Sequence, residues 1–577
     1  MSDRILLKTP QQDTQDEVPA WSQVLAQNLL GKFPETQAHT RETLAGYIVQ
    51  LGTALELGDT CLKQTTNHLN PEEAEWLRHP LVASGEHALT QPAPLVVEQA
   101  DAESRYVYFY RHWHQEWKLA ERLAALLNPA TAPAAVAVDL SQETSLKDLQ
   151  RQAIELAARH PFTLITGGPG TGKTYTLARI VKALQQAAPQ LRVALAAPTG
   201  KAAQRMQSVL SNEFKQAGVS GAQIQTAQTI HRLLGLGGRS TPRYHRSEPL
   251  PFDLIVIDEG SMLDLALASL LFDAIAVGTR VIILGDANQL AAVDAGAVLA
   301  DLDAVPALAP YRVALQESSR FKADEGIGLL AAGVLNQQED AVLKALTTSA
   351  QVQYINLAKT PNSAVFHQLW QGFQPYFEVL LKLKGASHPL TEDQVKALFL
   401  AFDQFRVLCA QRAGDLGAHA INRSIGEALQ QALGHSLIKR EGWYSGRPAM
   451  MTRNDYGLRI SNGDIGVCLV DQTGREWVYF PDRPAPIAAT RLPPEQIETA
   501  FALTIHKSQG SEFRQVAMVL DDSAEEMLTR ELIYTAITRA KEGVQVWSKQ
   551  ALLLQAIHKK SNRISGLMNQ IARKIAG

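Results

Sequence analysis

The chain has 577 residues, of which 46% are hydrophobic and 20% charged, and its net charge is −3. A single core rarely grows beyond about 250–300 residues, so this length predicts three or four domains. The composition is typical of a folded globular protein and argues against a disordered one. Because there is no overall basic excess, any contact with nucleic acid has to come from a local patch.

The cysteines and the N-terminal sequence indicate the cellular compartment of the protein. Cys61, Cys409 and Cys468 lie far apart and form no C-x-x-C pattern, which argues against a disulfide framework or a zinc site and fits a reducing cytosol. The first residues are polar and lack the apolar core of a signal peptide. No run approaches the roughly 20 apolar residues of a membrane span. We therefore expect a cytoplasmic protein with no membrane partner.

Residues 1–130 have a mostly helical pattern and contain no phosphate or metal motif. The aromatic and basic segment Arg105 to Leu126 is typical of a packed amphipathic helix. The Pro- and Ala-rich stretch Asn128 to Val138 then indicates a linker. We expect a helical N-terminal domain over residues 1–130.

Residues 140–325 alternate short apolar strands with helical segments. The strand candidates are Phe162–Ile165, Arg192–Ala196, Leu254–Ile257 and Arg280–Leu284. This alternation predicts a doubly wound parallel sheet, in which ligands bind at the carboxyl ends of the strands.

A glycine-rich turn follows the first of these strands and leads into a helix-compatible segment. It has the pattern G-x-x-x-x-G-K-T, the phosphate-cradling loop of nucleoside triphosphatases. Its glycines let backbone N–H groups point at one anion, and the helix adds its positive N-terminal end. The predicted nucleotide-binding residues are Gly167, Gly168, Pro169, Gly170, Thr171, Gly172, Lys173 and Thr174. Lys173 is expected to reach the β- and γ-phosphates, and Thr174 to hold Mg²⁺.

Two later strands deliver polar side chains to the same edge. In LIVIDEGSML, Asp258 and Glu259 stand just past an apolar strand. We expect Asp258 to coordinate Mg²⁺ and Glu259 to act as the general base toward water. In VIILGDANQL, the Gln289 carboxamide is placed to contact both the γ-phosphate and that water.

Residues 330–577 show a second α/β pattern, with strand candidates at Arg406–Cys409 and Gln515–Val519. It is interrupted at about 425–500 by a Gly-, Pro-, Arg- and Asp-rich stretch with short strands, which predicts a small β insertion. Whether Trp443 and Tyr444 in this stretch contact DNA or only pack is left open, with packing favoured. Arg320 and Arg539, which follow the first α/β unit and end the second, are candidate arginine fingers that neutralise transition-state charge.

Together these segments resemble the ordered motifs of superfamily 1 DNA helicases over roughly residues 145–550. Within that superfamily the chain is similar to the RecD family, the alpha subunits of bacterial exodeoxyribonuclease V (RecBCD). The matching segments are Gly167–Thr174, Ala197–Lys201, Thr229–Gly235, Asp258–Met262, Gly285–Leu290, Leu315–Phe321, Met450–Val467, Thr504–Glu512, Tyr534–Lys541 and Arg563–Ile571. The resemblance implies two RecA-like P-loop domains, a helical N-terminal domain and an SH3-like β insertion in the second motor domain.

The resemblance also assigns roles to individual residues. It implies that Gln150 reads adenine, that Glu512 contacts the ribose, and that Gln289, Arg320 and Arg539 sense the γ-phosphate. The residues implied to touch single-stranded DNA, or to couple it to ATP, are Thr199, Lys201, Thr229, His231, Thr504 and His506. Gly260 stands where the family pattern leads us to expect a small residue such as alanine, which puts nothing catalytic in doubt.

The function implied is an ATP- and Mg²⁺-dependent motor that moves 5′ to 3′ on single-stranded DNA and unwinds duplex ends in double-strand break repair and recombination. By the same resemblance it works in the cytoplasm, at the nucleoid, in a heterotrimer with RecB-like and RecC-like subunits, docked through residues 1–130. Two alternatives stay open: a stand-alone RecD-like helicase, and a non-motor nucleotide switch that acts as a scaffold. An intact Glu259 argues against the switch.

Overall fold

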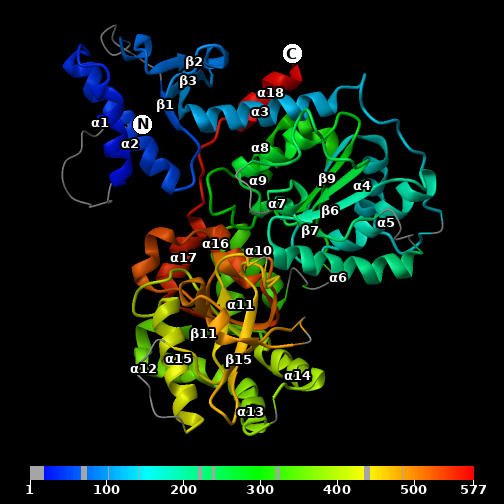
Figure 1. Cartoon of the computed structure of the whole chain (residues 1–577), viewed down its shortest axis with the longest axis vertical. Coiled ribbons are helices and arrows are strands. Elements are labelled where there is room, and N and C mark those ends of the chain that lie inside the picture. Colours follow the sequence, from blue (N-terminus) through cyan, green and yellow to red (C-terminus); the bar gives the residue numbers. More distant parts are fainter. Residues whose placement is uncertain are drawn as a thin grey trace.

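The structure is a computed structural model that describes residues 19–65, 75–101, 103–141, 143–218, 224–236, 241–318, 321, 325–386, 388–434, 442–455, 457–481, 483 and 485–576. Figure 1 shows an N-terminal region and a first α/β unit side by side, with a second α/β unit below them. Four sheets organise these parts. Within the described ranges, no helix has both the length and the apolar character needed to cross a membrane.

The N-terminal region is mixed rather than helical. Helices α1 (Ala20–Gly31) and α2 (Ala38–Glu56) pack against a four-stranded sheet of order β1-β4-β3-β2. Its strands are β1 (Leu62–Thr65), β2 (Val82–Ser84), β3 (Leu95–Gln99) and β4 (Ser104–Phe109). Our expectation of a helix from Arg105 was therefore wrong over its first five residues. These residues alternate between two buried faces of β4, and helix α3 begins only at Tyr110 and ends at Leu127.

The first α/β unit contains a six-stranded, fully parallel sheet of order β10-β5-β9-β8-β6-β7. The strands are β5 (Phe162–Gly167), β6 (Val193–Ala197), β7 (Gln228–Thr229), β8 (Leu254–Ile257), β9 (Arg280–Gly285) and β10 (Arg312–Leu315). All four predicted strands are present. Along β8, Leu254 and Val256 enter one core while Ile255 and Ile257 enter the other, so both faces are buried.

Helices cover both faces of this sheet. One face carries α4 (Asp148–Arg159), α5 (Lys173–Ala187) and α6 (Gly200–Ala217). The other carries the short α7 (Ile230–Leu233), α8 (Leu265–Ala274) and α9 (Val298–Ala304). Helix α3 packs against α8, so the C-terminal helix of the predicted N-terminal domain is part of the first motor core.

The second unit holds a five-stranded parallel sheet of order β11-β20-β19-β12-β18. The strands are β11 (Val352–Asn356), β12 (Phe405–Cys409), β18 (Ala502–Thr504), β19 (Phe513–Val519) and β20 (Ala540–Ser548). Its helices are α10 (Gly326–Leu335), α11 (Glu339–Thr348), α12 (Asn362–Gly372), α13 (Gln374–Leu383), α14 (Glu392–Phe402), α15 (Ala418–Ala432), α16 (Arg530–Ile537) and α17 (Gln550–His558). Two separate cores flank the sheet, which confirms a second parallel α/β domain.

A small antiparallel sheet of order β16-β15-β14-β13-β17 interrupts this unit. It comprises β13 (Pro448–Met451), β14 (Ile465–Val470), β15 (Glu476–Tyr479), β16 (Ile487–Ala488) and β17 (Ile497–Thr499), and it has its own apolar core. The all-β insertion predicted from turn residues and short strands is present.

The C-terminal tail leaves the second unit. Helix α18 (Leu567–Ala576) packs against α3 and α9, with Leu567 and Ile571 in the first motor core. Ahead of it, Arg563 donates to the Gly296 carbonyl at 2.9 Å, and the Ile564 N–H donates to Asp59 Oδ1 at 2.7 Å. The expectation that the second domain continues to residue 577 is therefore wrong for this segment (Figure 1). An amphipathic helix alone does not reveal which core covers it.

Candidate active site

One cleft collects the loops at the carboxyl ends of β5, β8 and β9 on one side and the segment 510–512 with Arg539 on the other. It has a volume of about 990 Å³. The predicted residues that line it are Pro169, Gly170, Thr171, Gly172, Lys173, Thr174, Lys201, Asp258, Glu259, Gln289, Glu512 and Arg539. Residues separated by more than 350 positions, such as Lys173 and Arg539, thus face one space. The cleft thus takes one wall from each α/β unit.

The glycine-rich loop has the backbone that its residues allow. Gly170 and Gly172 have φ values of 79° and 86°, in the left-handed region that favours glycine. The Lys173 Nζ donates to the carbonyl of Gly167 at 2.6 Å and to that of Gly168 at 3.1 Å. The ammonium therefore lies folded over the loop, within reach of an anion bound there.

Gln150 lies behind this loop. Its Nε2 is 2.7 Å from where a Cβ on Gly172 would stand, and its Oε1 accepts a hydrogen bond from the Lys147 N–H at 3.1 Å. It is not among the residues that line the cleft. The predicted contact with adenine needs the side chain to leave this cap of helix α4.

Two acids follow β8 in unlike settings. Burial and the neighbouring Glu259 carboxylate raise the pKa of Asp258 to about 6, outweighing Lys173 and Arg205, which act in the opposite direction. Glu259 has a φ of 53°, a left-handed conformation uncommon for a residue with a side chain. Such strain is typical of functional sites.

The cleft offers part of a divalent-cation site. The Thr174 hydroxyl and the Asp258 carboxylate both line it, and such oxygens are the ligands Mg²⁺ prefers. Among the described residues, no group of three or more His, Cys, Asp or Glu is placed to hold a metal. These two residues would therefore share the ion with phosphate and water.

Arg539 is almost fully buried at the junction between the two parallel sheets. Its guanidinium donates to Gln289 Oε1 at 2.5 Å, to the Ser511 carbonyl at 3.2 Å and to the Thr535 carbonyl at 3.3 Å. Burial lowers its pKa, although Glu259 and Glu512 oppose that effect. Gln289 belongs to the first unit, so this pair joins the two walls.

Other contacts cross the junction through residues of the matched segments to which the sequence assigned no role. The Tyr534 hydroxyl donates to Asp286 Oδ2 at 3.0 Å and lies 2.9 Å from where a Cβ on Gly168 would stand. The Thr535 hydroxyl accepts from the Leu290 N–H at 2.9 Å, and Gln509 Nε2 donates to the Leu290 carbonyl at 2.7 Å. Burial raises the pKa of Asp286, and Lys173 partly offsets this.

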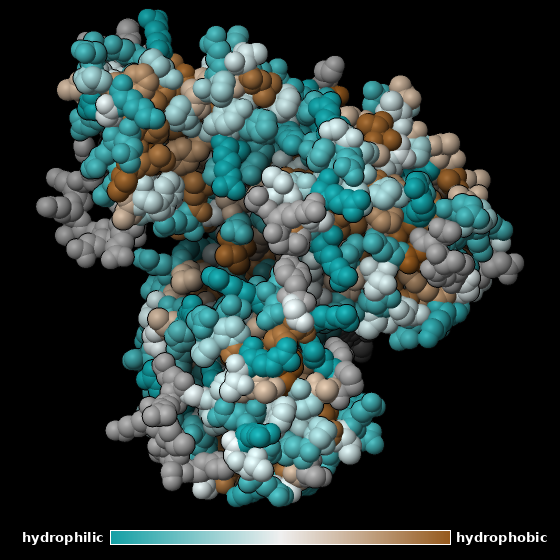
Figure 2. Space-filling model, viewed as in Figure 1, coloured by the Kyte–Doolittle hydropathy of each residue, from teal (hydrophilic) through white to brown (hydrophobic). Residues whose placement is uncertain are grey.

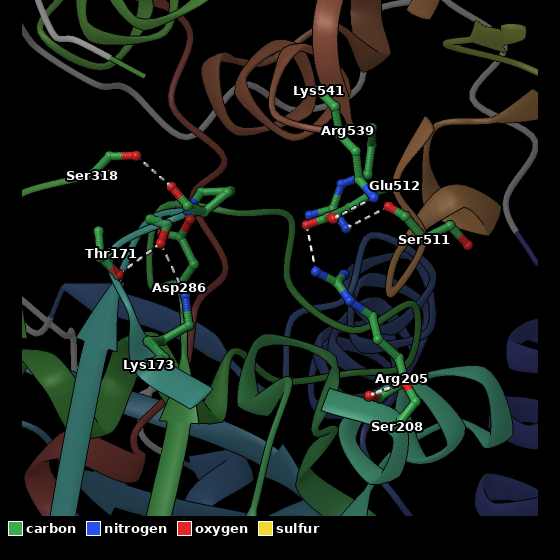
Figure 3. A network of polar contacts seen from close by, with 12 residues as sticks. Thr171, Lys173, Arg205, Ser208, Asp286, Ser318, Ser511, Glu512, Arg539 and Lys541 are labelled. Carbon is green, nitrogen blue, oxygen red and sulfur yellow. Dashed lines mark hydrogen bonds and ion pairs between the residues drawn. The ribbon is translucent and has the colours of Figure 1, made fainter. Parts of the chain in front are cut away.

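Glu512, predicted to contact ribose, lies between two cations. Arg205 Nη2 donates to its Oε1 at 2.5 Å, and Lys541 Nζ is 3.5 Å from its Oε2 (Figure 3). Arg205 comes from α6 in the first unit. Sequence reasoning missed it because nothing within the helix marks one arginine as facing a cleft.

The residues predicted to contact DNA fall into two groups. In the first unit, Thr199 and Thr229 cap the N-termini of α6 and α7, and His231 is exposed. Lys201 Nζ is 5.9 Å from the ring centre of Phe513, and burial lowers its pKa. In the second unit, Thr504 ends β18 and His506 lies just after it, and burial lowers the pKa of His506. Arg320 lies outside the described residues.

A second cavity, of about 660 Å³, lies between α15, the small sheet and the end of β18. Thr504, Lys507, Trp443 and Tyr444 all line it. Tyr444 also packs against α15, where its hydroxyl lies 2.5 Å from where a Cβ on Gly426 would stand. Both aromatic residues therefore pack and border a cavity, and their contact with DNA stays a prediction.

The sequence of this chain is similar to those of known proteins. Residues 150–295 match the family model described as an AAA domain, and residues 499–546 match the UvrD-like helicase C-terminal domain. A RecBCD enzyme subunit RecD of Mycolicibacterium smegmatis is 37% identical over 478 residues, which are 81% of this chain and 82% of that protein. The chain belongs to the RecD family.

Two further relatives place the chain within this family. Another RecBCD enzyme subunit RecD, from Mycobacterium tuberculosis, is 36% identical and covers 86% of this chain and 84% of that protein. The ATP-dependent RecD2 DNA helicase of Deinococcus radiodurans is 30% identical over 83% of this chain but only 60% of that protein. The RecD resemblance seen in the motifs is thus confirmed, and the lengths match the RecBCD subunits better than RecD2.

Proposed function

We propose that this chain is an ATP-dependent DNA helicase that moves 5′ to 3′ on single-stranded DNA as the alpha subunit of exodeoxyribonuclease V. The observation that carries the proposal is the single cleft lined by Lys173 of one α/β unit and Arg539 of the other. ATP binds there, and the complex acts on duplex ends in the cytoplasm, at the nucleoid, in double-strand break repair and recombination. RecD family membership supports the direction of travel and the RecB-like and RecC-like partners.

The residues of the cleft divide the work. The loop Gly167–Thr174 and Lys173 hold the phosphates, and Gln289, Arg320 and Arg539 neutralise charge that develops on the γ-phosphate. Glu259 accepts the proton of the attacking water. When bound, Mg²⁺ held by Thr174 and Asp258 supplies further positive charge to the phosphates. Gln150 and Glu512 orient the base and the ribose.

Closure and release of the cleft drive movement. The contacts Gln289–Arg539 and Asp286–Tyr534 already span the two walls, so a bound γ-phosphate adds attraction to a preformed junction. We take the two parallel α/β units as RecA-like motor domains and the small antiparallel sheet as an SH3-like insertion. Thr199, Lys201, Thr229, His231, Thr504 and His506 grip the strand on the two motors alternately.

Lys173→Gln tests this function. The variant is expected to lose both ATP hydrolysis and unwinding of a substrate with a 5′ overhang, since the phosphates lose their charged partner. The assay compares 5′ and 3′ overhangs in a strand-displacement experiment. Retention of both activities by the purified variant would show that the phosphate loop is misassigned, and little DNA-stimulated turnover in the unaltered chain would favour a nucleotide switch.

The N-terminal region is proposed as the docking surface for the partner subunits. Figure 2 shows apolar surface over this region, and its exposed apolar side chains include Trp21, Val24 and Leu57, which is 71% exposed. Since α3 is built into the first motor core, deletion of residues 1–130 would damage the motor. We therefore test the surface with the combined substitution of Trp21, Val24 and Leu57 by serine.

The expected result is loss of co-purification with the RecB-like and RecC-like subunits while ATP hydrolysis stimulated by DNA persists. Val293→Ser is the matched control, because this side chain is as exposed as that of Leu57 but lies on the first motor unit. Intact co-purification of the triple variant would refute docking through this surface. If the triple variant and unaltered chain co-purify equally poorly, the stand-alone alternative gains support.

A further inference from the structure

One face of helix α6 forms a seam with the second motor domain. Gly510 approaches Thr199 and Ala202: a Cβ on Gly510 would lie 3.7 Å from Thr199 Oγ1 and 3.5 Å from the Ala202 Cβ. One turn further along the helix, Arg205 pairs with Glu512 at 2.5 Å. Positions 201 and 205 are one turn apart on the same face, and Lys201 faces Phe513. The first two turns of α6 therefore lie along the segment 510–513.

Arg205 lies at the point where this seam meets the nucleotide cleft. It lines the cleft together with Asp258, Glu259 and Glu512. The charges of Glu512, Glu259 and Asp258 all act on it and keep its guanidinium positive despite burial. Lys541 lies on the other side of Glu512, so this carboxylate keeps a cationic neighbour if Arg205 moves away.

We propose that Arg205 is a nucleotide-responsive residue that pairs with Glu512 before nucleotide binds and turns to the triphosphate when ATP binds. This inference rests on the proposed function. A guanidinium forms two parallel hydrogen bonds to phosphate as readily as to carboxylate, so it can exchange one partner for the other. Glu512, released by Arg205 and still neutralised by Lys541, becomes available to the ribose hydroxyls.

The exchange links the nucleotide to the DNA contacts. Lys201 lies one turn before Arg205 on α6 and Thr199 caps the start of that helix, while Thr504 and His506 lie on the chain that leads to Glu512. Exchange of the Arg205–Glu512 pair rearranges the seam between these two groups of DNA contacts. Since coupling between two ligands is reciprocal, DNA on these residues must change nucleotide affinity by the same factor as nucleotide changes DNA affinity.

The test measures this coupling factor directly in the full-length chain. The dissociation constant of a fluorescent, non-hydrolysable ATP analogue is measured with and without an oligothymidylate. We expect the unaltered chain to show at least about a 5-fold difference, the lower end of common allosteric coupling, and Arg205→Gln to show less than about 2-fold. Arg205→Lys retains the charge but not the paired N–H donors of the guanidinium, so its coupling factor should lie between those of the unaltered chain and Arg205→Gln. Arg192→Gln is the control, because it breaks an ion pair with Asp253 within the first unit, away from the cleft.

The charge swap Arg205→Glu with Glu512→Arg separates a phosphate contact from a simple ion pair. It restores opposite charges across the seam but leaves no guanidinium on α6 to meet phosphate, so the coupling should stay lost. Restored coupling in the swap, or undiminished coupling in Arg205→Gln, would overturn the role of Arg205. An unaltered chain that binds the analogue without any coupling would overturn it as well. If the unaltered chain binds no analogue, the proposed function itself fails. Lys173→Gln is the reference for such a loss of nucleotide binding.

Discussion

Glu116 connects three parts of the chain through one buried carboxyl group. Its Oε1 accepts hydrogen bonds from the Thr60 hydroxyl at 2.5 Å and the Ser565 hydroxyl at 3.2 Å, and its Oε2 accepts from the Tyr108 hydroxyl at 3.1 Å. Thr60 and Tyr108 belong to the N-terminal region and Ser565 to the C-terminal tail. Burial raises the pKa of Glu116 from 4.5 to about 8. The folded protein therefore holds a proton here at neutral pH.

The sign and size of the effect follow from linkage. Between pH 4.5 and about 8 the unfolded chain has lost this proton while the folded chain keeps it. The unfolded state binds fewer protons, so the free energy of unfolding falls as pH rises through this window and levels off above it. Each pH unit costs about 1.4 kcal/mol, so raising the pH from about 5.5 to 8 costs about 3 kcal/mol from this group alone.

Glu116→Gln removes this titration while keeping an oxygen for Thr60 and Ser565 and an amide that can donate to Tyr108. We expect the Tm of the variant, relative to the Tm of the unaltered chain, to be higher at about pH 8.5 than at about pH 5.5, because only the unaltered chain has a proton to lose. Thermal unfolding followed by tryptophan fluorescence measures it. Glu155→Gln, on an exposed part of α4, serves as the control. An equal Tm difference at both pH values would refute the reasoning.

Three substitutions address the cleft. Arg539→Ala should lower DNA-stimulated kcat for ATP by about 10³-fold or more, since both walls lose their shared guanidinium; a fall below ten-fold in a phosphate-release assay would contradict the finger role. Glu259→Gln should lower kcat by about 10²–10⁴-fold while the dissociation constant of an ATP analogue stays unchanged, and parallel losses in both would argue against a general base. Tyr534→Phe leaves the buried Asp286 short of a donor at the junction and should raise KM for ATP up to about ten-fold in steady-state kinetics, whereas an unchanged KM would show that this contact does not help close the cleft.

The parallel sheets could be predicted because their strands are continuous apolar runs. Segments such as LIVI at 254–257 are buried on both faces, and a run of that kind followed by polar residues has few other interpretations. The phosphate loop and the acids after β8 could also be predicted, because their chemistry depends on local spacing. Their convergence with Arg539 could be predicted only through the family pattern.

The parts that sequence reasoning missed depend on tertiary contacts. Residues 105–109 read as the start of a helix because aromatic residues are compatible with either element; pairing with β3 and β1 makes them a strand. Arg205 lies outside the matched motifs and Tyr534 begins one of them, but only the approach of the opposite domain gives either side chain its partner. The destination of α18 was hidden for the same reason, since its apolar face fits any core of suitable shape.

The returning tail has a mechanical consequence. The chain passes from the first motor to the second between Leu315 and Gly326, and passes back between His558 and Leu567. These two connections restrict how one motor unit can move relative to the other. A sliding motion would change the distance that each connection has to span, whereas a rotation about the line through both connections leaves these distances unchanged. We therefore expect the two units to move relative to each other mainly by rotation about the line through these two connections.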